Sequence, residues 1–245
     1  MIRFVNRGLA FAISVAVAGA ACADQFQITV TNLGPQPISP MFLAASNSNF
    51  DAFSVGSTAS LGIKNIAEMG DATAMQAIAA GAGSDIAQYT VGPSVLTTGQ
   101  SYTVNLTADS AHPYLTYISM LGKTNDGFVG GAVGDGALNL YVGSNPLAFS
   151  YILTGTQAWD AGTELNTQNA ADLAFLGGTG NPADSNNLIR QHGGVIPGVG
   201  DSWQLMPAWG LTEDLVRLDV APVPEPATFA VLGIGLLAAL RRRKK

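Results

Sequence analysis

The segment Gln25-Phe26-Gln27-Ile28-Thr29-Val30-Thr31 alternates strictly between polar and apolar side chains. Alternation with a period of two is typical of a strand with one buried face, and here Phe26, Ile28 and Val30 form that face. Asn32-Leu33-Gly34-Pro35 follows, a cluster of turn residues that ends the strand. The segment therefore predicts the first strand of an antiparallel sheet.

Further short strands follow along the chain, separated by glycine, asparagine and aspartate. Residues 114–121 are almost continuously apolar, as expected of a central strand. In 137–142 we expect Leu138, Leu140 and Val142 on one face. The predicted strands after the first are 38–45, 86–91, 102–106, 114–121, 137–142, 150–153 and 215–220.

Two helical segments interrupt this series of strands. Residues 58–69 place Ala59, Ile63 and Ile66 on one face, and residues 72–80 follow, with Asp71 as the cap and Gly81 closing the helix. Residues 155–200 are rich in glycine and lack periodicity, which indicates loops. About eight short strands with turn residues between them predict an all-β fold, an antiparallel β-sandwich with a short helical insert.

The beginning of the sequence has the features of a secretory signal peptide. Arg3 and Arg7 precede an apolar run over residues 8–20, and Ala21-Cys22-Ala23 closes it as a small-x-small cleavage site. We expect residues 1–23 to form a signal helix that is removed. Cys22 raises a lipoprotein alternative, but Gly19 stands where the lipobox normally has leucine.

The last residues combine Val223-Pro224-Glu225-Pro226, an uncharged segment over 227–240 and five cations at 241–245. This arrangement resembles the PEP-CTERM sorting signal of Gram-negative envelope proteins. The resemblance implies a transient C-terminal membrane helix, recognition and cleavage by an exosortase-type transpeptidase, and delivery to the envelope or the extracellular matrix. The alternative is an ordinary membrane anchor, although a span usually needs about 20 residues.

The segment between these two signals is strongly acidic. From Asp24 to Pro226 there are 17 acidic and 4 basic residues, a net charge of −13, and no cysteine. Such a charge disfavours nucleic acid and anionic lipid as partners. The lack of cysteine excludes disulfides, thiol catalysis and thiolate metal sites. We expect one domain over residues 24–222, exported through the inner membrane.

Three motifs of this domain resemble the spondin domain. They are Gly62-Ile63-Lys64-Asn65-Ile66-Ala67-Glu68-Met69-Gly70-Asp71, then Ser119-Met120-Leu121 with Asn125-Asp126-Gly127-Phe128-Val129-Gly130, then Trp159-Asp160-Ala161-Gly162-Thr163-Glu164. The order and spacing are those expected of bacterial members, which are similar to the F-spondin N-terminal domain. The resemblance implies a C2-like antiparallel sandwich that occurs in extracellular matrix and cell-surface proteins, with a function in binding rather than catalysis.

The resemblance also implies a calcium site at Asp126, Asp160 and Glu164. Calcium takes six to eight oxygen ligands at about 2.3–2.6 Å, and loops at one end of a sandwich can bring three carboxylates together. Gly162 lets the loop fold so that Asp160 and Glu164 face one point. The alternative is that Asn125-Asp126-Gly127 and Asp160-Ala161-Gly162-Thr163 are ordinary turns.

Two functions follow from these motifs. The first is a calcium-supported adhesion module of the envelope or matrix, which binds exopolysaccharide or another surface protein. The alternative is an envelope polysaccharide hydrolase that uses Asp160 and Glu164 as a carboxylate pair, which would have to lie about 5–9 Å apart in a cleft. His112 and His192 are the only histidines, and no catalytic motif accompanies them.

Overall fold

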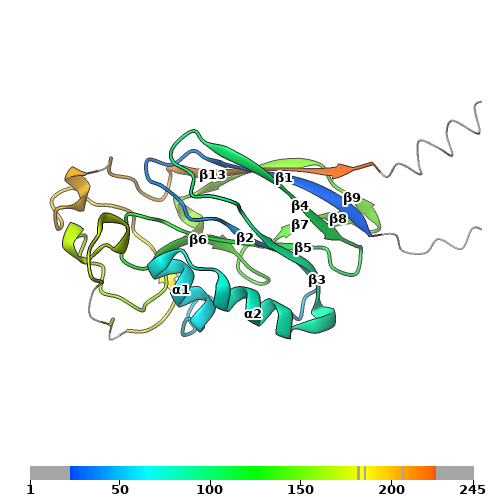
Figure 1. Cartoon of the computed structure of the whole chain (residues 1–245), viewed down its shortest axis with the longest axis horizontal. Helices are drawn as coiled ribbons and strands as arrows, with labels where there is room; N and C mark the ends of the chain where they lie inside the picture. Colours follow the sequence, from blue (N-terminus) through cyan, green and yellow to red (C-terminus); the bar gives the residue numbers. More distant parts are fainter. Residues whose placement is uncertain (1–22, 181–182, 185, 206, 225–245) are drawn as a thin grey trace, which may run out of the picture.

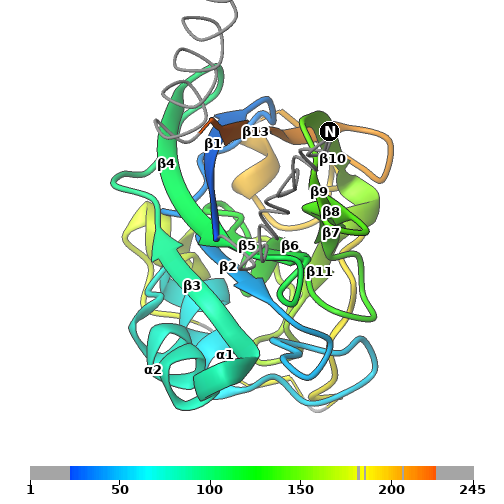
Figure 2. The same cartoon turned by 90° about the vertical axis from the view of Figure 1, so that its right-hand side faces the viewer.

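The computed structural model describes residues 23–180, 183–184, 186–205 and 207–224. Two antiparallel sheets pack face to face, and two helices cover the outer face of one of them (Figures 1 and 2). The predicted antiparallel β-sandwich with a helical insert is therefore confirmed. The predicted signal helix and C-terminal membrane helix lie outside the described residues. Within the described ranges, no helix is long and apolar enough to cross a membrane.

The first sheet contains the strand that was predicted from residues 25–31. Phe26, Ile28 and Val30 are fully buried, as the alternation predicts. Gln25 pairs with Val223, so the first and last strands of the fold start and finish side by side. The strands, in their order across the sheet, are β10 (Phe149–Thr154), β13 (Asp214–Val223), β1 (Asp24–Asn32) and β4 (Ser101–Ala108).

The second sheet is built around β5 (Tyr114–Met120), which is buried from its second residue to its last, as its almost continuously apolar sequence predicts. Strand β7 (Leu138–Asn139) pairs with β5 beside the main path, and β8 (Tyr141–Val142) and β9 (Asn145–Pro146) form a separate hairpin. The strands, in order, are β12 (Arg190–Gln191), β11 (Ala158–Asp160), β6 (Gly127–Gly131), β5 (Tyr114–Met120), β2 (Phe42–Ser46) and β3 (Ile86–Val91).

Helices α1 (Leu61–Met69) and α2 (Thr73–Gly81) form the third layer. The Ser60 side chain accepts a hydrogen bond from the Ile63 N–H and caps α1, and Gly70 ends that helix at φ 70°. The described chain also contains the short 3₁₀ helices η1 (Gly83–Asp85), η2 (Gly155–Gln157), η3 (Ala170–Asp172), η4 (Ala174–Leu176) and η5 (Ser202–Gln204).

Two apolar cores hold these layers together. The larger core lies between the sheets, where Phe26 and Tyr141 meet edge to face at 5.5 Å between ring centroids. The smaller core lies between the second sheet and the helices, and it contains Phe42, Ile118 and Ile66. Burial of these side chains is the main favourable term for folding, because no disulfide is available.

The bounds of several predicted elements differ from the structure. The expected strand over 137–142 breaks at Leu140, whose N–H bonds to the Pro113 carbonyl, so β7 and β8 pair with different partners. Leu140 is buried while Val142 is exposed, so the predicted common face was wrong. Strand β2 starts at Phe42 rather than at residue 38: Ile38 forms only isolated bridges, and Pro40 has no N–H to donate to a sheet.

The helix predicted at 72–80 starts one residue later, at Thr73, and includes Gly81. Asp71 is not the capping residue that the sequence predicts, because Ala72 stands at that position and makes no side-chain cap hydrogen bond to α2. The Asp71 carboxylate accepts a hydrogen bond from the Thr73 N–H at 2.8 Å.

Candidate functional site

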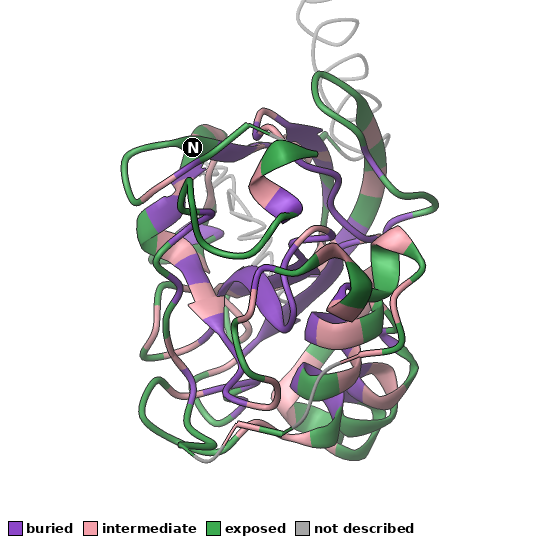
Figure 3. Ribbon diagram, turned by 90° about the vertical axis from the view of Figure 1, so that its left-hand side faces the viewer, coloured by how far each residue is buried: buried purple, intermediate pink, exposed green. Residues whose placement is uncertain are grey.

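Two neighbouring strands of the second sheet bring the candidate acids together. Strands β6 and β11 run antiparallel, with Gly127 opposite Asp160, so the loop before β6 and the loop after β11 meet at one end of the sandwich. Asp126 immediately precedes β6, and its carbonyl accepts a hydrogen bond from the Ala161 N–H at 3.0 Å. We call this the loop end, defined by residues 121–126, 161–180, 192–205 and 207–212; it lies at the left of Figure 1, and Figure 3 views the molecule from that side.

Asp126 is fully buried and fixes the loop that follows β11. One carboxylate oxygen, Oδ2, accepts hydrogen bonds from the N–H groups of Thr163 at 2.7 Å and Glu164 at 2.9 Å, and from the Thr163 hydroxyl at 3.3 Å. The other oxygen, Oδ1, has no hydrogen-bond partner among the described residues. Burial raises the pKa of Asp126, and the bonds from Glu164 and Thr163 oppose that rise only in part.

Asp160 is 2% exposed and fully hydrogen-bonded. Its Oδ1 accepts a bond from the Gly162 N–H at 2.8 Å, and its Oδ2 accepts bonds from Asn166 Nδ2 and Arg190 Nη2, both at 3.0 Å. Burial, together with the charge of Asp126, raises the pKa of Asp160 to about 6. The two buried carboxylates therefore repel each other across the site.

Gly162 permits this loop, as its position in the motif suggests. Its φ is 69°, and a Cβ there would lie 2.5 Å from the Leu188 carbonyl oxygen. A side chain would therefore be strained both by the backbone conformation and by the close approach of another loop.

Glu164 joins the site through its backbone. Its N–H bonds to Asp126, and its carboxylate extends towards Gly180, with Oε1 3.1 Å from where a Cβ on that glycine would stand. In the part of the chain that the structure describes, no three His, Cys, Asp or Glu side chains are placed so that they could hold one metal ion. The structure thus brings Asp126 and Asp160 together, with Glu164 as a backbone neighbour.

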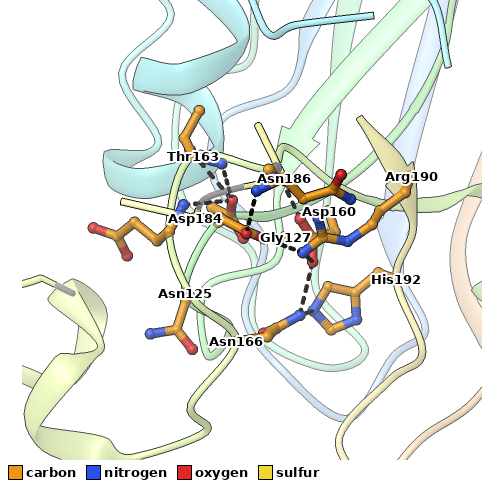
Figure 4. Close-up of polar contacts among 12 residues, drawn as sticks. Asn125, Gly127, Asp160, Thr163, Asn166, Asp184, Asn186, Arg190 and His192 are labelled. Carbon is orange, nitrogen blue, oxygen red and sulfur yellow. Dashed lines mark hydrogen bonds and ion pairs between the residues drawn. The ribbon is translucent and has the colours of Figure 1, made fainter. Parts of the chain in front are cut away.

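Several polar neighbours of Asp160 were not predicted from the sequence. The Arg190 guanidinium bonds to Asp160 and also contacts Asp184, and Asn166 lies between Asp160 and His192 (Figure 4). Arg190 stands in β12, directly opposite Asp160 in the register of the sheet. The one available signal was that Arg190 is among only four cations between Asp24 and Pro226.

His192 packs against the site as a buried, neutral residue. It is 1% exposed, its Nδ1 accepts a hydrogen bond from the Gly194 N–H at 3.0 Å, and its ring stacks on Trp209 at 5.4 Å between centroids. Burial and the nearby Arg190 lower the pKa of His192 to about 4. The ring therefore packs the base of the loops without carrying charge at neutral pH.

The burial of Asp126 and Asp160 limits the chemistry that these two carboxylates can perform. A glycosidase acid has to reach a glycosidic oxygen from a cleft, and Asp160 is covered by its own loop and by Arg190. Two buried carboxylates with one unpartnered oxygen suit the binding of a cation or the fixing of loops better than proton transfer to a large substrate.

The fold is an antiparallel β-sandwich with a helical layer, and the site lies in the loops at one end of it. Residues 31–169 match the family model Spondin_N, more than half of the chain, and residues 222–244 match the PEP-CTERM protein-sorting motif. The protein belongs to the Spondin_N family. The sorting motif marks it for export to the envelope or the extracellular space and for processing by an exosortase-type enzyme. No curated protein sequence matches the chain.

Proposed function

We propose that this protein is an adhesion or matrix module that binds exopolysaccharide or another surface protein through its loop end, and that calcium stabilises that end. The observation that carries the calcium proposal is the buried Oδ1 of Asp126, which lacks a hydrogen-bond partner beside a second buried carboxylate. An unpartnered buried oxygen is costly unless a ligand satisfies it.

The unpartnered Asp126 Oδ1 and the neighbouring Asp160 carboxylate have the oxygen chemistry that a hard divalent cation prefers. Calcium prefers carboxylate and carbonyl oxygens and tolerates irregular coordination completed by water. Asp126 and Asp160 would supply the carboxylates, and the loop of Glu164 would supply a further oxygen. A bound ion would neutralise the repulsion between the two acids and cross-link the loops before β6 and after β11.

The position of the loop end supports a role in binding. Strand β1 begins and β13 finishes at the opposite end of the sandwich, where Gln25 pairs with Val223, and the sorting motif starts at residue 222 (Figure 1). A chain held to the membrane by that motif would direct its loop end away from the bilayer. Ile196, Leu205 and Phe175 expose about half of their surface in these loops and offer apolar contact area.

Thermal unfolding of the full-length chain in detergent, with excess calcium or with chelator, tests the calcium proposal. At a calcium concentration of about 100 times the dissociation constant we expect a stabilisation of about 2.7 kcal/mol. For a domain of this size that corresponds to a rise in Tm of roughly 5–10 °C. Asp126→Asn should abolish the rise, because it removes a charged ligand.

Asp219→Asn is the matched control, because Asp219 is a half-exposed acid on β13 that is paired with Arg217, away from the loop end. It should keep the full calcium response. An equal Tm with calcium and with chelator in the wild type would refute calcium stabilisation, and so would a full response in Asp126→Asn.

A further inference from the structure

One positively charged side chain, that of Arg190, belongs to the acidic site. Arg190 Nη2 lies 3.0 Å from Asp160 Oδ2 and also contacts Asp184 Oδ2, so one guanidinium nitrogen bridges two carboxylates (Figure 4). Both acids are well covered, with side-chain exposures of 3% for Asp160 and 8% for Asp184, while that of Arg190 is 34%. The guanidinium therefore lies on the solvent side of Asp160 and Asp184.

The other cations of the described chain are engaged elsewhere. Lys64 faces Glu68 on α1, Arg217 pairs with Asp219 on β13, and Lys123 bonds to the Leu205 carbonyl. The backbone of Arg190 is paired directly with Asp160 across β11 and β12, which keeps its side chain within reach of that carboxylate.

Building on the calcium binding proposed above, we propose that Arg190 is an internal counter-ion that competes with the divalent cation for Asp160, and that Asp184 sets the strength of this competition. In the cation-free site the guanidinium offsets the charge of Asp160. When a cation enters between Asp126 and Asp160, it meets a positive charge that is held within hydrogen-bond distance of one ligand. Two cations on one buried carboxylate repel each other strongly, because the surroundings screen them less than water does.

Asp184 gives the guanidinium an alternative partner. Its Oδ1 accepts a hydrogen bond from the Asn186 N–H at 2.8 Å, which holds the carboxylate in place, and its Oδ2 already contacts Arg190. The arginine side chain can therefore withdraw from Asp160 onto Asp184 without losing its counter-charge. The bridge between Asp160 and Asp184 is the feature that makes this exchange possible.

The proposal predicts opposite effects for two substitutions. Arg190→Gln removes the competing charge and should tighten calcium binding about tenfold, while it lowers the Tm of the calcium-free protein because Asp160 loses its counter-ion. Asp184→Asn leaves Arg190 with Asp160 as its only charged partner and should weaken calcium binding by a similar factor. Arg190→Lys keeps the charge and should stay within about threefold of the wild-type affinity.

Calorimetric titration of the full-length chain with calcium chloride measures these affinities, and thermal unfolding in chelator measures the calcium-free stability. Arg217→Gln is the matched control, because it breaks an arginine–aspartate pair on the other sheet and should leave the calcium affinity unchanged. Asp184→Asn provides an independent test should Arg190→Gln fail to fold.

The outcomes separate this inference from the proposed function. Calcium binding by the wild type with unchanged affinity in Arg190→Gln or Asp184→Asn would overturn the role of Arg190 and leave calcium stabilisation standing. Binding by Arg190→Gln but not by the wild type would support the competition and overturn calcium stabilisation of the natural protein. No binding by either would overturn both.

Discussion

Replacing Asp126 with alanine removes the acceptor that holds the loop after β11. The N–H groups of Thr163 and Glu164 bond to one Asp126 oxygen at 2.7 and 2.9 Å. Hydrogen bonds to a charged group contribute about 1.5–3 kcal/mol each, so the pair contributes roughly 3–6 kcal/mol. Part of this is offset, because the substitution also removes a buried charge that repels Asp160. We expect a net loss of about 3 kcal/mol.

Asp126→Asn is the matched comparison, because it keeps an oxygen acceptor of the same shape and removes the charge. With chelator present, it should lose less than about 1 kcal/mol. Urea unfolding of the full-length chain, followed by tryptophan fluorescence, measures both changes. In thermal unfolding, the alanine variant should melt roughly 6–12 °C below the wild type. Equal losses in the two variants, or a loss below about 1 kcal/mol in the alanine variant, would refute the argument that these two backbone bonds hold the loop.

Three further perturbations test other parts of the structure. Gly194→Ala should cost about 3 kcal/mol or more in urea unfolding, because φ is 91° and the new Cβ would lie 2.0 Å from the Trp209 carbonyl oxygen, whereas Gly193→Ala, with open space around it, should be nearly neutral. With chelator present, the free energy of unfolding of the wild type should fall relative to that of the Asp160→Asn variant as the pH rises from about 4 to about 6. The reason is that Asp160 in the folded protein retains a proton that the unfolded chain has lost. The fall is about 3 kcal/mol at most, and a flat difference would contradict the raised pKa. Ile66→Ala should cost about 2–5 kcal/mol by opening the helix–sheet core, and a loss below 1 kcal/mol would argue against that packing.

The fold was predictable where the pattern of side chains is local. Alternation marked β1, continuous apolarity marked β5, and turn residues marked the ends of both. Strands β6 and β11 escaped prediction because they are short, rich in glycine or interrupted by charge, and are held by partners far away in the sequence. The break at Leu140 was equally hidden, because its cause is a hydrogen bond to the Pro113 carbonyl.

For the candidate site, the sequence predicts the acids Asp126, Asp160 and Glu164 and gives no sign of the role of Arg190. Asp126 and Asp160 follow from the spondin resemblance, and the structure brings them together at the loop end. Arg190 lies 30 residues beyond Asp160 in a segment without periodicity, and it reaches Asp160 only through the pairing of β11 with β12. Its partner Asp184 stands in a loop whose path no local pattern predicts.

By itself, the sequence predicted the sandwich class, the candidate acids and the sorting motif, because alternation, motif spacing and charge are properties of neighbouring residues. Only the tertiary structure decided that one oxygen of Asp126 lacks a partner and that Arg190 bridges Asp160 and Asp184. The physical reason is that burial and strand register arise from contacts between distant segments, and these contacts decide which charges share a site shielded from water.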